Sequence, residues 1–421
     1  MPTNATEVVY AGIALATGTR HELETESGMA HLVEHMTFKG TATRTARQIT
    51  GRIESVGGEL NAYTAKEETV YYAAFHRQHL HRAIPLLLDM AFASTYPQTE
   101  LEREREVVID EIESYNDTPA ELIYDDFESL LFPQQPLGRN ILGNAERLRQ
   151  YASADLLAFA RRRYTPQRAL LFIRGSVTLQ QLMRELRTTK ELENNTKEHG
   201  NSTEATAPQL SDPAPFPSVC PTGLPSSSSP QFPGISDYFP NISVVDKGTH
   251  QAHVMLGARA FSLTDPRLPG LALLMNMLGG PAMNARLCQS LRERAGLVYT
   301  VEAGTTAYTD TGLWTIYFGC DHEDVQRCLR LTHRELHRLT QAPLSPRALA
   351  AAQRQLCGQL AIAAEHTENN TLAAAKLFLH TAHVRTLDEQ CREIWQLTPD
   401  TLHQIALDTL QPHLITTLIY H

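Results

Sequence analysis

The sequence carries one pattern twice, and this repeat limits the folds that the chain can adopt. Residues 28–36 and 270–278 align without a gap, with glycine, alanine and leucine at three shared positions. An apolar segment typical of a buried strand precedes each copy, at residues 8–16 and 253–260. A repeat of this kind indicates a duplicated unit. The sequence therefore predicts two halves of similar fold.

A change in composition separates the two copies. From residue 188 to residue 240 the chain is rich in Asn, Ser, Thr and Pro. Such a segment cannot bury a hydrophobic core and is typical of a flexible linker. We therefore predict a first half at 1–187, a linker at 188–240 and a second half at 241–421.

Both halves mix strand and helix patterns, which predicts the α+β class, with mostly antiparallel sheets covered by helices. Short charged or polar turns connect several of the predicted strands. Predicted strands lie at 59–64, 69–75, 169–175, 314–318 and 414–420, and predicted helices at 43–56, 79–94, 151–163, 324–339 and 346–364.

The overall charge excludes some classes of partner. The chain has 37 basic and 47 acidic residues, a formal net charge of −10, which gives no support for binding nucleic acid or an anionic membrane. No apolar run is long enough to span a bilayer, and the first ten residues do not resemble a signal peptide. The six cysteines form no C-x-x-C pair. A cytoplasmic protein with reduced thiols is the expectation.

The first copy of the repeat contains a candidate metal site. If residues 27–38 are helical, His31, Glu34 and His35 lie at i, i+3 and i+4 on one face. Two imidazoles one turn apart can ligate a metal ion, and the carboxylate beside them can accept a proton. A histidine pair on a helix is more often a surface or core feature, so the motif alone leaves both interpretations open. The second copy has leucine, asparagine and methionine at these positions, so the helix itself does not require the polar set.

A third candidate ligand lies on a later helix. A helix predicted from residue 99 onward places Glu104 and Glu111 on one face with two valines. Burying a carboxylate costs several kcal/mol unless a cation compensates its charge, and a metal ion would do so. A solvated acidic helix is the alternative for these two residues.

The whole chain, apart from the linker, resembles the insulinase and pitrilysin family of zinc peptidases. It is similar to the shorter branch that includes the mitochondrial processing peptidase and its bacterial relatives. The resemblance rests on residues 28–41, on G-G-E-L-N-A-Y-T at 57–64 and on the helix ending at Glu111. The family places its third ligand at a comparable distance after the second histidine, and here Glu111 follows His35 by 111 − 35 = 76 residues.

The resemblance implies a role for each residue of the motif. One Zn²⁺ per chain would be bound by His31, His35 and Glu111, with a fourth position for water. Glu34 would be the general base and then the acid that protonates the leaving amine. Glu104 would assist catalysis by orienting a ligand or relaying a proton.

The resemblance also implies how substrate and subunits are arranged. Asn61 and Ala62 would contact the backbone of a peptide added to the edge of strand 59–64. Arg292 and Tyr299 would contact substrate from the second half, although a surface arginine and a core tyrosine are the alternative on sequence alone. The halves would face each other like a clamshell, and the chain would form a homodimer.

Two functions follow as hypotheses from these patterns. The first is a zinc-dependent metalloendopeptidase that hydrolyses peptides or unfolded polypeptide segments. The alternative is a non-proteolytic peptide-binding or assembly subunit of the same fold. Glu34 favours the first hypothesis, because a structural zinc site normally has four protein ligands and does not need a base.

Overall fold

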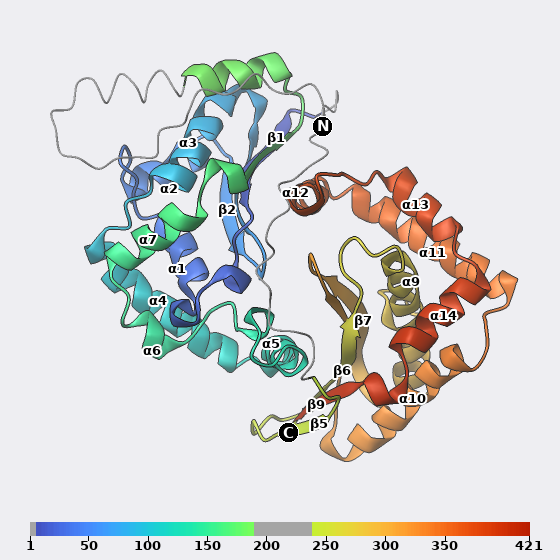
Figure 1. Ribbon diagram of the computed structural model, residues 1–421. Coiled ribbons are helices and arrows are strands. Elements are labelled where there is room, and N and C mark those ends of the chain that lie inside the picture. The colour runs from blue at the N-terminus through green and yellow to red at the C-terminus, as the bar shows by residue number, and fades with distance from the viewer. Residues whose placement is uncertain (1–5, 189–237) are drawn as a thin grey trace. The chain divides into compact units, whose positions relative to one another are not determined.

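A computed structural model describes residues 6–188 and 238–421 of the chain. It is an α+β protein with two sheets (Figure 1). By the density of their internal contacts, the residues form two compact units. The first contains the chain up to residue 110 and again from residue 140, and the second contains residues 111–139 and those from 236 onward.

The first unit is built on a four-stranded antiparallel sheet in the order β2-β3-β1-β4. Its central strand β1 is almost wholly buried, as its apolar sequence predicts. Helices α1 and α3 pack on the sheet, and their apolar side chains form the core between helix and strand. The elements of this unit are β1 (Val8–Leu15), α1 (Met29–Thr37), α2 (Ala46–Glu54), β2 (Glu59–Thr64), β3 (Thr69–His76), α3 (Leu80–Ala93), α6 (Ala145–Leu148), α7 (Ser153–Arg163), β4 (Ala169–Arg174) and a helix at 179–188, while α4 (Gln98–Asn116) begins in it.

The second unit is built on a five-stranded sheet in the order β5-β9-β6-β8-β7. Only the edge pair β5 and β9 is parallel, so this sheet is mostly antiparallel too. In chain order, helix α9 follows strand β6 in the second unit, as α1 follows strand β1 in the first. The elements are α5 (Pro119–Leu131), β5 (Ile242–Val245), β6 (Ala252–Ala260), α9 (Leu268–Gly279), β7 (Val298–Ala307), β8 (Gly312–Cys320), α10 (Val325–Gln341), α11 (Pro346–Ala364), α12 (Thr367–Thr381), α13 (Leu387–Trp395), α14 (Pro399–Thr409) and β9 (Thr416–Tyr420).

The boundary between the units departs from the predicted division at residue 187. Helix α5 belongs to the second unit, because its apolar face packs on the second sheet. Phe127 and Leu131 share a buried cluster with Met255, Leu418 and Tyr420. Helix α5 has no counterpart among the predicted helices, and its position depends on this long-range packing. Most of the predicted linker, at 189–237, lies outside the described residues.

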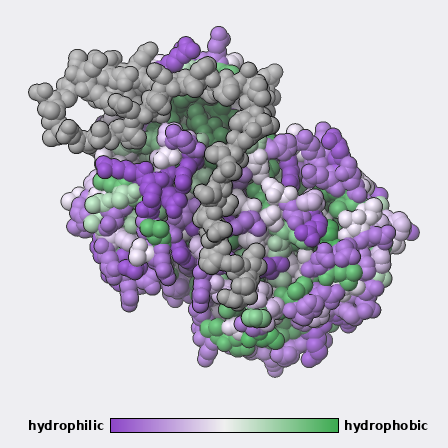
Figure 2. All heavy atoms as spheres, viewed as in Figure 1, coloured by the Kyte–Doolittle hydropathy of each residue, from purple (hydrophilic) through white to green (hydrophobic). Residues whose placement is uncertain are grey.

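On the face shown in Figure 2, hydrophilic side chains predominate and hydrophobic ones form smaller areas between them. The edge strand β5 is an exception, with Ile242 71% and Val244 59% exposed. Within the described ranges, no helix has both the length and the apolar character needed to cross a membrane.

Candidate metal centre

Helix α1 begins at a backbone position that requires glycine. Gly28, its N-cap residue, has a φ of 78°, in the left-handed region. A Cβ atom on Gly28 would lie 2.7 Å from the carbonyl oxygen of Leu142, and one on Gly143 would lie 2.4 Å from the Gly28 Cα. The two glycines therefore allow the loop at 140–144 to contact the first turn of α1.

A buried carboxylate satisfies the first amide groups of the same helix. Oε2 of Glu22 accepts a hydrogen bond from the Gly28 backbone N–H at 3.1 Å, and Oε1 accepts one from Ala30 at 2.8 Å. Negative charge at a helix N-terminus is favourable because the amide dipoles point toward it. Glu22 thus fixes the end of α1 that lies one turn before the histidines.

The structure brings the three predicted metal ligands together. Among the residues it describes, His31, His35 and Glu111 form the only group of three or more possible ligands, each offering one atom within 4.8 Å of the others. The imidazole rings of His31 and His35 lie on one face of α1, with their centroids 4.5 Å apart. This proximity follows from their i, i+4 spacing, as the sequence indicates.

Glu111 lies on α4, one continuous helix from Gln98 to Asn116. Leu101, Glu104 and Val108 form its buried face, at i, i+3 and i+7. Val107 is 51% exposed and Glu111 is also exposed, whereas Glu104 and Val108 are buried. Of the two alternatives, the solvated position therefore holds for Glu111 and the buried one for Glu104. Burial of Glu111 is therefore not what favours a metal ion, and its position beside the two histidines is the relevant observation.

Glu104 connects α4 to the histidine helix. One of its carboxylate oxygens lies 3.1 Å from Nδ1 of His35, and the other lies 2.5 Å from Nζ of Lys39. Burial by itself would raise the pKa of Glu104, but the hydrogen bonds and charges of His35 and Lys39 outweigh it and hold this pKa below its ordinary value. An Nδ1–H that donates to the carboxylate leaves the lone pair of the His35 Nε2 available for a metal.

Glu34 is held from a strand of the adjacent sheet. It is 9% exposed, and its Oε2 accepts a hydrogen bond from the hydroxyl of Thr64, the last residue of β2, at 2.6 Å. Thr64 had no predicted role beyond its place in the strand. Only the register of the sheet brings it to α1, so the spacing of residues could not have indicated the contact.

Three of the four predicted substrate contacts lie on edge strands, and the fourth, Arg292, lies in the short helix at Cys288–Glu293. Asn61 and Ala62 belong to β2, which pairs on one side with β3 and forms one edge of the four-stranded sheet. In the second unit, Arg292 is half-exposed, and Tyr299 in the edge strand β7 is 89% exposed. Tyr299 is thus not a core residue, which was the alternative for it.

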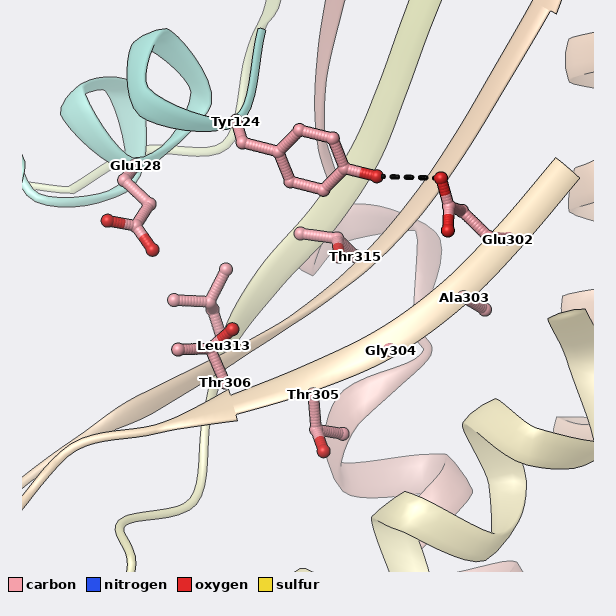
Figure 3. Close-up of a pocket in the computed structure, with 9 residues that line it drawn as sticks. All are labelled: Tyr124, Glu128, Glu302, Ala303, Gly304, Thr305, Thr306, Leu313 and Thr315. Atoms are coloured by element: carbon pink, nitrogen blue, oxygen red, sulfur yellow. Dashed lines mark hydrogen bonds between the residues drawn. The ribbon is translucent and has the colours of Figure 1, made fainter. Parts of the chain in front are cut away.

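A separate polar pocket lies within the second unit, between α5 and strands β7 and β8. Its volume is about 210 Å³. The Tyr124 hydroxyl points across it and donates a hydrogen bond to Oε1 of Glu302 at 3.1 Å (Figure 3). The lining residues are Tyr124, Glu128, Glu302, Ala303, Gly304, Thr305, Thr306, Leu313 and Thr315. None of them belongs to the predicted site.

Comparison with known proteins identifies the family. Residues 2–145 match the family model described as insulinase (peptidase family M16), and residues 152–356 match that of the peptidase M16 inactive domain. An uncharacterized zinc protease of Bacillus subtilis, YmxG, is 31% identical over 94% of this chain and 89% of its own length. The chain belongs to peptidase family M16. An uncharacterized zinc protease of Streptomyces coelicolor is 30% identical, over 95% of this chain and 82% of its own.

Solved M16 structures share the fold. A protease from Helicobacter pylori aligns with a TM-score of 0.83 and 19% identity, covering 99% of this chain and 94% of its own. A peptidase M16 inactive domain from Pseudomonas fluorescens aligns with a TM-score of 0.81 and 16% identity, covering 100% and 94%. The predicted family and the two-domain α+β fold are thus confirmed. The second half, which matches the inactive-domain model, has Leu273, Asn276 and Met277 in place of the metal motif.

Proposed function

We propose that this M16 protein is a zinc-dependent endopeptidase that cleaves peptides or unfolded polypeptide segments. The observation that carries the proposal is the convergence of His31, His35 and Glu111, with the carboxylate of Glu34 on the same helix as the two histidines. The names of the relatives, which are called zinc proteases, support the choice of metal.

The ligand set fits zinc on chemical grounds. Two imidazole nitrogens and one carboxylate oxygen are a donor set that zinc accepts at catalytic sites, where three protein ligands leave one position open. His31, His35 and Glu111 would hold one ion per chain. Zinc bound there would supply a Lewis acid that polarises the peptide carbonyl and makes water acidic near neutral pH.

The other residues would each carry a defined step. Glu34 would take a proton from the attacking water and transfer it to the leaving amine, for which its place one residue before His35 is suitable. Glu104 would keep His35 in the tautomer that has a lone pair on Nε2. Asn61 and Ala62 would bind an extended peptide along the edge of β2, and Arg292 and Tyr299 would add contacts from the second unit.

A Glu34→Gln variant tests the proposal. We expect it to bind zinc at the level of the unmodified protein and to lose peptide cleavage by about 10²- to 10⁴-fold, because the amide cannot accept the proton. The assay is digestion of a peptide library, with and without a chelator, alongside zinc content by atomic emission. Glu106→Gln, a change at an exposed position of α4, is the matched control.

Two results would contradict the proposal. Unchanged turnover in the Glu34→Gln variant would exclude Glu34 as the base. Zinc binding without any cleavage by the unmodified protein would favour a peptide-binding or assembly subunit, the function that the inactive-domain match of residues 152–356 keeps open. The expected homodimer stays a prediction, which analytical ultracentrifugation would test.

A further inference from the structure

The hydroxyl of Thr64, the last residue of strand β2, donates a hydrogen bond to the carboxylate of Glu34 on α1. The distance of 2.6 Å from Thr64 Oγ1 to Glu34 Oε2 is within the range of a charge-assisted O–H···O⁻ bond. The two residues are 30 positions apart in sequence. A carboxylate of such low exposure needs a donor, and the contact supplies one.

The neighbouring strand determines which way this hydroxyl donates. Thr64 lies directly opposite Thr69 in the β2–β3 ladder. The Thr69 hydroxyl donates to the backbone carbonyl of Thr17 at 2.9 Å, and the Thr64 and Thr69 oxygens lie 3.4 Å apart. Since Thr69 uses its proton on Thr17, and Thr64 has a single proton that the carboxylate accepts, the Thr64 hydroxyl is directed at Glu34.

The strand that carries Thr64 also carries the proposed substrate edge. Asn61 and Ala62 lie three and two residues before Thr64 on β2. The outer side of β2 is the edge of the sheet, where an extended peptide could add as a further strand. A peptide bound there would order the strand whose last residue contacts the base.

We propose that Thr64 is a positioning residue that holds the Glu34 carboxylate in place for proton transfer, so that β2 links peptide binding to the base. This inference rests on the proposed endopeptidase function. It assigns Thr64 a role in kcat, because a fixed orientation of the base matters in the transition state and adds little to the affinity for substrate.

Three variants test the proposal. Thr64→Val keeps the β-branched shape and removes the hydroxyl, and Thr64→Ser keeps the hydroxyl. Thr50→Val is the matched control, since the Thr50 hydroxyl donates to the Ala46 carbonyl of its own helix. We expect Thr64→Val to lower kcat by about 10- to 100-fold, with KM and zinc content little changed. Thr64→Ser should recover most of the loss, and Thr50→Val should match the unmodified protein.

A crystal structure of the zinc-loaded Thr64→Val protein gives a readout that does not depend on turnover. We expect the Glu34 carboxylate to leave the position it has in the unmodified protein, and to return to it in Thr64→Ser. An unmoved carboxylate, an unchanged kcat or an effect on KM alone would overturn the inference. If the unmodified protein cleaved no peptide, the endopeptidase proposal would fail, while the position of Glu34 would still decide the role of Thr64.

Discussion

Nδ1 of His35 on α1 lies 3.1 Å from Oε1 of Glu104 on α4, and the two residues are 69 positions apart in sequence. The second carboxylate oxygen of Glu104 contacts Lys39, four residues after His35 and just beyond the end of α1. This arrangement fixes the orientation of the His35 ring and the nitrogen that it presents to a metal ion.

Replacing Glu104 is therefore expected to weaken zinc binding. In Glu104→Ala, His35 loses the acceptor of its Nδ1–H, and we expect the zinc affinity to fall by about 10- to 100-fold while the fold is retained. Competition with a chromophoric chelator measures the affinity. The control is Glu106→Ala, which changes an exposed glutamate of the same helix. Equal zinc affinity for the two variants would show that Glu104 does not orient the ligand.

The contact between Gly28 and Gly143 predicts a steric requirement. Gly143 and Gly57 share a φ of 78°, but a Cβ on Gly143 would lie 2.4 Å from Gly28, whereas one on Gly57 would meet nothing within 4 Å. Both alanine variants incur the left-handed backbone penalty of about 1–2 kcal/mol. We expect Gly143→Ala to be the less stable by thermal unfolding and to bind zinc more weakly, because it displaces the start of α1. Equal melting temperatures would contradict this.

The packing of α5 on the second sheet should contribute strongly to stability. Phe127 is fully buried among residues of β6, β8 and β9. Phe127→Ala is expected to lower the free energy of unfolding by about 3–5 kcal/mol, since it removes apolar contacts and leaves a cavity. Phe378→Ala, at a side chain that is 41% exposed, should cost much less. Urea denaturation measures the free energy of unfolding of both variants. Similar losses in the two would mean that Phe127 does not anchor α5 to the second sheet.

His253 predicts a dependence of stability on pH. Burial lowers the pKa of His253, and the nearby His322 lowers it further, while its Nδ1 lies 2.8 Å from the Tyr317 hydroxyl. The unfolded chain therefore binds a proton at a pH where the folded chain does not. The contribution of His253 to the free energy of unfolding is therefore fully present above about pH 6.5, the ordinary histidine pKa. It decreases as the pH falls below that value.

The His253→Gln variant tests this dependence. We expect its urea midpoint to change less between about pH 7.5 and pH 5 than that of the unmodified protein, because the half-buried imidazole that resists protonation is gone. His413→Gln, at an exposed position, should keep the original dependence. An unaltered pH profile in His253→Gln would exclude His253 as a source of the effect.

Much of the architecture could be predicted because the patterns are local. The apolar strand at Val8–Leu15 and the helix that carries His31 and His35 follow from periodicity within a dozen residues. Local patterns could not predict three features: which strands form the sheet edges, which unit α5 belongs to, and which side of α4 is exposed. Each of them depends on which distant surface a helix or strand packs against.

The sequence by itself determined the two similar halves and the pairing of His31 and His35 on one face, because a helical spacing of four residues fixes that proximity wherever the helix lies. Only the tertiary structure decided which groups from outside α1 reach this face. Glu111, Glu104 and the hydroxyl of Thr64 come from elements far along the chain, and sheet register and helix packing place them within contact distance.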